Sequence, residues 1–102
     1  MKVEWLSEAR NEFREFLQYY QTEVGAPYAR KFADCILSST EQLAQFPEMG
    51  VLKYDTLMGK YSFRALFIDK YVCVYKIEAD TVRIYHLADA RKNYIYHIFG
   101  ME

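Results

Sequence analysis

The side chains best suited to chemistry on a charged substrate lie in the second half of the 102-residue chain. Arg64 and Arg91 carry planar guanidinium groups, which donate paired hydrogen bonds to phosphate and keep their charge at physiological pH. His86 carries an imidazole, a group that exchanges a proton near neutral pH and suits general acid or base catalysis. Tyr94 offers a phenol for proton transfer or a ring for base stacking.

Each of these side chains also has a structural interpretation. Arg64 can pair with a carboxylate such as Asp89 or Glu78, and Arg91 can be an ordinary surface charge. Tyr94 is one of ten tyrosines and can fill the core. Lone histidines on strands are often structural, which applies to His86 and even more to His97 near the end of the chain.

The charge of the chain limits how it can bind nucleic acid. Its formal net charge is −1, so it lacks the general attraction that a strongly basic chain has for a phosphate backbone. Any RNA contact must come from a local patch. Besides Arg64 and Arg91, we expect this patch to include Lys60, Arg83 and Lys92.

The cysteine and histidine content predicts neither a metal site nor a cofactor. Cys35 lies in an apolar helical stretch and Cys73 in a strand-like stretch, which predicts two buried small hydrophobic side chains. The start of the chain has no secretion signal, and no apolar run approaches the roughly 20 residues that cross a bilayer. We therefore expect a cytoplasmic protein.

The first half of the chain predicts a strand and two helices. Residues 2–6 alternate polar and apolar side chains and are followed by Ser7, a good helix N-cap. An apolar stripe then recurs every three or four residues from Ala9 to Val24, and Gly25 ends that helix. Pro27 opens a second helix, whose stripe continues to Phe46 before Pro47.

The second half predicts strands. Residues 61–68, 71–77 and 82–88 are rich in β-branched and aromatic side chains, and the short links between them suit antiparallel hairpins. Within them Arg64 should share a face with Ile68, and His86 with Ile84 and Ala88. Residues 51–54 are a further candidate strand, and residues 91–102 are either a short helix or a tail packed on the sheet.

The order is β-α-α-β-β-β, with a further strand if residues 51–54 form one. This order predicts one α+β domain over residues 1–102, with an antiparallel sheet and a helical hairpin on one face. Hydrophobic residues make up 52% of the chain, enough for a packed helix–sheet core. The opposite face of the sheet is expected to be open and to carry the function.

Several local patterns together resemble the RelE/ParE-type toxins of type II toxin–antitoxin systems, the plasmid stabilisation superfamily. The resemblance covers essentially the whole chain. It rests on the opening VEWLSEARNEFREF, Ala29 with Phe32, the exit LAQFPEMG at residues 43–50, Arg64, the run YVCVY at residues 71–75, and VRIYHLADAR at residues 82–91.

The resemblance implies a toxin that a cognate antitoxin neutralises. In the ribonuclease branch, metal-independent mRNA cleavage at the ribosome would place Arg64 and Arg91 on the phosphate, with His86 or Tyr94 in proton transfer. The low basic content departs from that branch. The alternatives are a ParE-like poison that binds DNA gyrase without cutting RNA, and an inactive relative. We expect RNA cleavage, by a narrow margin.

Overall fold

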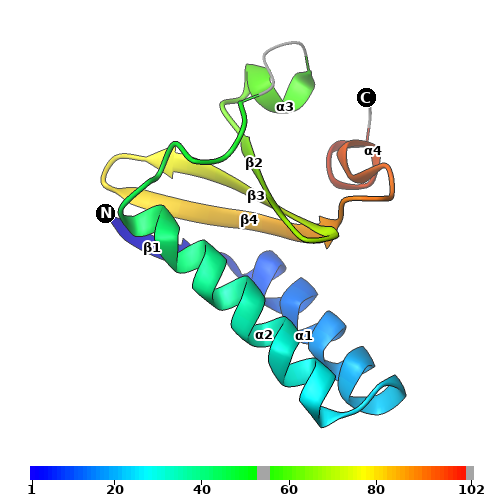
Figure 1. Cartoon of the computed structure of the whole chain (residues 1–102). Helices are drawn as coiled ribbons and strands as arrows, with labels where there is room; N and C mark the ends of the chain where they lie inside the picture. The colour runs from blue at the N-terminus through cyan, green and yellow to red at the C-terminus, as the bar shows by residue number, and fades with distance from the viewer. Residues whose placement is uncertain (53–55, 101–102) are drawn as a thin grey trace.

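The computed structural model describes residues 1–52 and 56–100. Figure 1 shows the chain as a central sheet with helices on both sides. The elements in chain order are β1 (Lys2–Trp5), α1 (Ser7–Glu23), α2 (Ala26–Glu41), the 3-10 helix η1 (Gln42–Ala44), α3 (Leu57–Lys60), β2 (Arg64–Ile68), β3 (Tyr71–Glu78), β4 (Thr81–Asp89) and α4 (Tyr94–Phe99).

The sheet has four strands in the order β1-β4-β3-β2. β2, β3 and β4 form two antiparallel hairpins, and the first loop residue of each has a positive φ, 53° at Asp69 and 57° at Ala79. β1 pairs with β4 in parallel, from Lys2 opposite Thr81 to Trp5 opposite Ile84. The expected sheet is confirmed except at this pair. The β1–β4 pair is parallel because the helices that follow β1 carry the chain back across the sheet, which a short turn cannot do.

The start of α1 differs from the prediction. Leu6, not Ser7, is the N-cap residue, and Ser7 is already helical. The Leu6 amide donates to the Ile84 carbonyl oxygen at 3.0 Å, so the ladder between β1 and β4 holds the backbone extended up to Leu6. Strand pairing therefore overrode the capping preference of the serine.

The two long helices form the predicted hairpin, with Gly25 between them at a φ of 133°. α2 is shorter than its apolar stripe suggested. It ends at Glu41 and tightens into η1, which keeps Leu43 fully buried, whereas the predicted core residue Phe46 is 60% exposed. Cys35 also lies on the exposed side of α2, so the prediction that both cysteines are buried holds only for Cys73.

The main core lies between the helical hairpin and the sheet, as predicted. Aromatic rings dominate its centre, with Phe13 stacked on Phe32 at 5.5 Å and Phe32 against Tyr71 at 5.1 Å between ring centroids. Its buried members are Ala9, Tyr20, Ala29, Phe32, Ile36, Leu43, Ile68, Tyr71, Cys73, Tyr75, Val82, Ile84 and Leu87.

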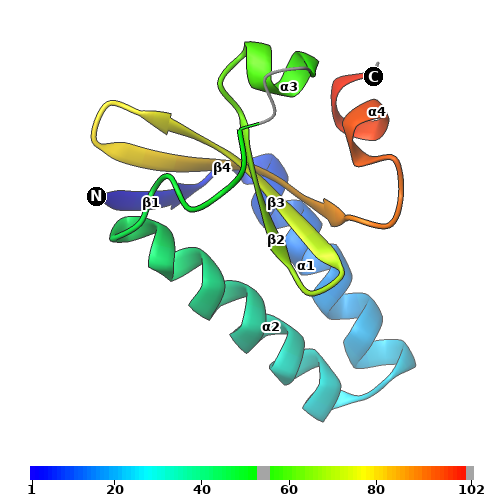
Figure 2. The same cartoon turned by 45° about the horizontal axis from the view of Figure 1, so that its top comes forward.

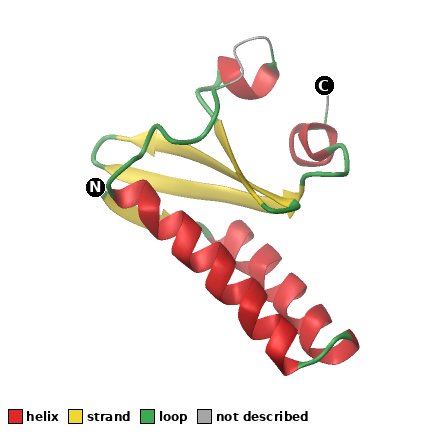
Figure 3. Cartoon of the chain, viewed as in Figure 1, coloured by secondary structure: helices red, strands yellow, loops and turns green. Residues whose placement is uncertain are grey.

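The opposite face of the sheet is partly covered, contrary to the expectation that it is open. Figure 2 shows α3 and α4 on the side of the sheet away from α1 and α2, and Figure 3 shows the same layering by element type. A second cluster forms there from Met58, Ala65, Val72, Val74 and Tyr94. The exposed area of this face that could bind a ligand or a partner is therefore smaller than the sequence indicated.

The segments that build this second layer were the least well predicted. Tyr61 and Ser62 form a turn after α3, with Ser62 at a φ of 65°, so β2 starts at Arg64 and not at residue 61. Of the candidate strand at 51–54, Val51 makes an isolated bridge with Ala65, and residues 53 and 54 lie outside the described part.

The final segment forms α4 and also packs on the sheet, which combines the two alternatives left open. The Asn93 side chain caps the helix by accepting from the Tyr96 amide at 3.2 Å, and Gly100 ends it in the left-handed conformation. Within residues 1–52 and 56–100, no helix is long and apolar enough to cross a membrane.

Candidate functional site

Arg64 is bound to backbone carbonyl groups of the loop that precedes it. Its Nη1 donates to the Gly50 carbonyl oxygen at 2.9 Å and to the Glu48 carbonyl oxygen at 3.3 Å. It therefore pairs with neither Asp89 nor Glu78, the carboxylates considered from the sequence. Its charge is directed at this loop, and its side chain is half-buried against it.

Tyr75, directly opposite Arg64 in the sheet, holds the same loop. Its hydroxyl donates to the Pro47 carbonyl oxygen at 2.7 Å and accepts from the Gly50 amide at 2.8 Å. Burial raises the pKa of this phenol, so it stays protonated and able to donate. Arg64 and Tyr75 together form a polar latch on residues 47–50.

Arg83 and Lys60 lie apart from the other candidate residues. Arg83, in the first half of β4, contacts the carboxylates of Glu4 at 3.3 Å and Glu78 at 3.7 Å. Lys60 is the last residue of α3 and is exposed. Neither lines the groove that contains Arg91.

Three of the predicted residues, Arg91, Lys92 and Tyr94, meet in one groove of about 770 Å³. It runs between α1, the end of β4 and α4. Its other lining residues are Glu12, Glu15, Phe16, Tyr19, Tyr20, Lys70, Leu87, Ala88, Asp89 and His97. The groove combines cations, carboxylates and aromatic rings, a composition suited to contacts with a protein or with a nucleic acid.

Arg91 is already engaged within this groove. It contacts Asp89 through two side-chain hydrogen bonds, Nε to Oδ1 at 3.0 Å and Nη2 to Oδ2 at 2.7 Å. The Arg91 amide also donates to Oδ1 at 2.9 Å. These bonds lower the pKa of Asp89 to about 2 and raise that of Arg91, because each stabilises the charged form of its partner.

Tyr94 lies in the second core cluster, so its structural interpretation is confirmed for most of the side chain. Its ring is 8% exposed, and its hydroxyl has no hydrogen-bond partner among the described residues. A buried hydroxyl without a partner costs about 1–3 kcal/mol. The ring packs at 6.3 Å from that of Phe67, an arrangement that positions α4 on the sheet.

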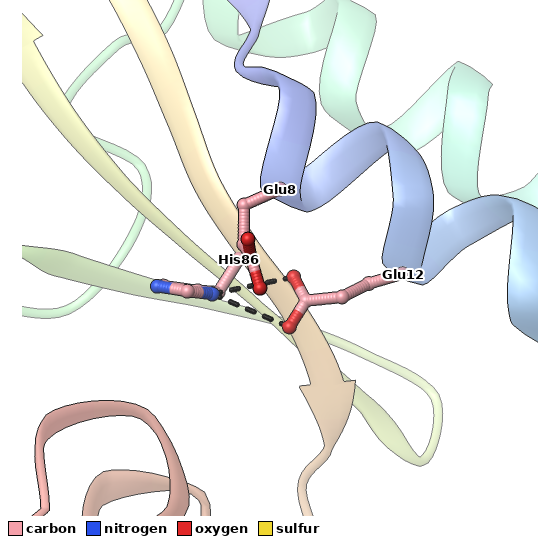
Figure 4. Close-up of side chains that lie close together, drawn as sticks. All are labelled: Glu8, Glu12 and His86. Atoms are coloured by element: carbon pink, nitrogen blue, oxygen red, sulfur yellow. Dashed lines mark hydrogen bonds and ion pairs between the residues drawn. The ribbon is translucent and has the colours of Figure 1, made fainter.

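His86 contacts a carboxylate of α1. Its Nδ1 lies 3.3 Å from both Oε1 and Oε2 of Glu12, and the neighbouring Leu87 amide donates to Glu12 Oε1 at 3.0 Å. Figure 4 shows the carboxylate of Glu8, one helical turn before Glu12, beside the same imidazole. The sequence did not indicate this group, although the spacing of Glu8 and Glu12 places both on one side of a helix.

A bulge in β4 positions His86. The pairing of β3 with β4 passes from Val74–His86 to Tyr75–Ile84, which leaves Tyr85 as an extra residue. An extra residue reverses the alternation of side chains beyond it. Ile84 therefore lies in the helix-facing core, so the prediction that it shares a face with His86 is wrong. His86 and Ala88 both follow the bulge and pair with Val74 and Val72 of the second cluster, so the prediction that these two share a face is confirmed.

The candidate catalytic residues do not converge on one point. Arg64 is opposite Tyr75, whereas Asp89, the partner of Arg91, is opposite Tyr71. Tyr71 and Tyr75 are about 13 Å apart along β3, and the two arginines are bound to different partners, so they do not hold one phosphate in this arrangement. Among the described residues, the expected constellation of two arginines with a histidine or tyrosine is not assembled.

The sequence also did not indicate the role of Lys70. Its Nζ lies 5.7–5.9 Å from the ring centroids of Tyr20, Tyr28 and Tyr71, and it donates to the Tyr28 hydroxyl at 3.3 Å. The hydroxyls of Tyr20 and Tyr71 also share a hydrogen bond. Lys70 lies in the short link between β2 and β3, and nothing local shows that two tyrosines distant in the sequence, Tyr20 and Tyr28, join its neighbour Tyr71 around it.

Comparison with known proteins places the chain in a family. Residues 3–94 match the model of the ParE toxin of the type II toxin–antitoxin system parDE. One similar solved structure belongs to the chromosomal ParDE toxin–antitoxin system of P. aeruginosa, at a TM-score of 0.74 and 15% identity. The similarity covers 87% of this chain and 95% of that one, and the search of curated proteins found no match. The chain therefore belongs to the ParE toxin family of type II toxin–antitoxin systems.

Proposed function

We propose that this protein arrests growth by binding DNA gyrase, in the manner of ParE-type toxins, and that it does so without cutting RNA. The match to the ParE family over residues 3–94 is the observation that carries the proposal. The gyrase alternative thus has more support than the mRNA cleavage favoured from the sequence.

The geometry of the arginines supports the same choice. A metal-independent ribonuclease needs cations placed where negative charge develops on one phosphate. Here Arg64 binds backbone carbonyl groups and Arg91 binds Asp89, at positions separated along the sheet. Together with the net charge of −1, this leaves little basic surface for an RNA substrate.

We also propose that a cognate antitoxin neutralises the protein through a second groove, formed by α1, α2 and β1. The groove has a volume of about 370 Å³ and is lined by Trp5, Arg10, Phe13, Arg14, Leu17 and Leu37. Its floor is apolar and it carries two arginines. An amphipathic helix with acidic flanks complements such a surface in shape and charge.

The target is tested by three measurements on the same induced cells and by one in vitro. We expect growth arrest with a DNA-damage response and intact mRNA, and inhibition of supercoiling when purified protein is added to gyrase. In-frame mRNA cuts that disappear in the double variant Arg64→Ala/Arg91→Ala would instead establish the ribonuclease. No arrest by the wild type would indicate an inactive relative.

The antitoxin surface is tested separately, with the cognate antitoxin as the binding partner. Arg10→Glu/Arg14→Glu should weaken antitoxin binding while growth arrest is retained, because the substitutions repel acidic flanks. Arg30→Glu, an exposed residue of α2 outside the groove, is the matched control. Equal loss of binding in both variants would contradict the assignment of this groove.

A further inference from the structure

Glu8, Glu12 and His86 form a cluster of three possible metal ligands that the proposed function does not use. Glu8 and Glu12 come from adjacent turns of α1 and His86 from β4, and Figure 4 shows their polar groups pointing toward one another. One carboxylate oxygen from each glutamate and one nitrogen of the imidazole all lie within 4.8 Å of one another. Small side-chain rotations would bring these atoms to the spacing of ligands on one ion.

The charges of the cluster favour a cation. Two carboxylates four residues apart on a helix repel each other. His86 Nδ1 contacts Glu12, whereas the Glu8 carboxylate makes no hydrogen bond or ion pair with the described residues. A divalent ion between the two carboxylates would remove this repulsion and give Glu8 a partner.

The surroundings of the cluster orient two of its three ligands. The Leu87 amide donates to Glu12 Oε1 at 3.0 Å and so fixes that carboxylate from the strand. The β4 bulge at Tyr85 positions His86, the residue directly before Leu87. Such outer contacts are what hold metal ligands in a defined orientation. The side chains of His86 and Glu12 are 22% and 26% exposed, which leaves a path for an ion and for water ligands.

We propose that Glu8, Glu12 and His86 bind one divalent transition-metal ion of the Zn²⁺ class, with water completing its coordination. One imidazole nitrogen with two carboxylate oxygens suits Zn²⁺, whereas Ca²⁺ and Mg²⁺ prefer oxygen ligands alone. The ion would join α1 to β4 directly. It would stabilise the folded chain, because the unfolded chain does not hold the three ligands together.

Calorimetric titration of the full chain with ZnCl2 tests the proposal. All proteins should carry Cys35→Ser, because an exposed thiol is itself a Zn²⁺ ligand. We expect one ion per chain and a higher Tm with Zn²⁺ than without it, and a much smaller effect of Mg²⁺ or Ca²⁺ at the same concentration. Absence of Zn²⁺ binding at millimolar concentration would overturn the proposal.

Two variants with matched controls locate the site. Glu8→Gln and His86→Gln should each weaken Zn²⁺ binding by about tenfold or more and remove the Tm increase. Glu8 is exposed, so the first variant should fold normally. Glu15→Gln on α1 and His97→Gln on α4 should bind Zn²⁺ like the parent. Equal binding by Glu8→Gln and its parent would overturn the site and reduce the cluster to an ion pair between His86 and Glu12.

Discussion

At the scale of single residues, the arginines expected to bind phosphate have partners inside the chain. Arg64 donates to carbonyl oxygens of a neighbouring loop, and Arg91 makes a two-point contact with Asp89. The sequence correctly indicated that these side chains had structural alternatives. It did not identify the partner of Arg64, because backbone carbonyls carry no sequence signature.

The Asp89–Arg91 pair should contribute to stability only above acidic pH. The pKa of Asp89 is lowered to about 2 in the folded chain from 3.8, so the contribution is complete above about pH 4 and lost as pH falls toward 2. Because Arg91 is 67% exposed, Asp89→Asn should cost about 1 kcal/mol or less at pH 7. Urea unfolding at several pH values measures this cost.

The difference between wild type and Asp89→Asn should shrink as pH falls from 6 to 2.5. Asp34→Asn, at an exposed position of α2, serves as the control for loss of a carboxylate outside this pair. A constant difference between wild type and Asp89→Asn over this range would show that the ion pair is not its source.

The two cysteines should differ sharply in reactivity. Cys73 is fully buried in the main core, and burial raises the pKa of its thiol to about 12, so it forms almost no thiolate near neutral pH. Cys35 is exposed. A colorimetric thiol reagent should therefore label one thiol per native chain and two after denaturation.

Cys35→Ser identifies the reactive thiol. We expect no rapid labelling of this variant in its native state and labelling of one thiol after denaturation. Fast labelling of native Cys35→Ser would mean that the main core opens far more readily than its packing indicates.

At the scale of the elements, the latch formed by Arg64 and Tyr75 connects the loop at residues 47–50 to the sheet. Gly50 is required there because an added Cβ would lie 2.6 Å from the hydroxyl oxygen of Tyr75. The same loop follows η1, so the latch joins the end of the helical hairpin to β2 and β3. These hydrogen bonds fix the position of the segment that connects the helical hairpin to the sheet.

Tyr75→Phe should lower the free energy of unfolding by about 1–3 kcal/mol, because it leaves the Gly50 amide and the Pro47 carbonyl without their partner. Gly50→Ala should cost a similar amount, about 1–3 kcal/mol, through the clash with the ring. Urea unfolding monitored by circular dichroism measures both.

Tyr85→Phe is the matched control for the latch. Its hydroxyl contacts the half-exposed Glu78 carboxylate at 2.8 Å, so its loss should cost less. If Tyr75→Phe were as stable as Tyr85→Phe, the latch would have no part in stabilising the fold.

At the scale of the whole molecule, the sheet is packed on both faces. The helical hairpin covers one face, and α3 with α4 covers part of the other, where Phe63 and Phe99 lie 5.2 Å apart between ring centroids. The large groove lies where α4 meets the end of β4 and α1. The second layer therefore builds this groove as well as covering apolar strand residues.

Ending the chain at Ala90 should expose this second face. The truncation removes the packed residues Tyr94, Ile95, Ile98 and Phe99, and we expect it to cost at least about 2 kcal/mol of stability. The exposed face should also bind a fluorescent apolar dye and promote self-association. Dye fluorescence and analytical ultracentrifugation measure these effects.

Tyr96→Ala, an exposed position of α4, is the control and should leave dye binding and sedimentation the same as in the parent. A truncated chain as stable and as free of dye as the parent would show that α4 is not part of the folded core.

The sequence by itself determined the α+β class, the helical hairpin, the three long strands and the family. The class, the hairpin and the strands follow from apolar periodicity and from local signals such as Gly25 and Pro27, which depend on neighbours along the chain. The family follows from the resemblance of several local sequence patterns, not from periodicity. Only the tertiary structure decided the parallel pairing of β1, the bulge that positions His86, and the partners of Arg64, Glu12 and Lys70. Each of these depends on residues far apart in the chain, whose contacts form only when the helices and strands pack together.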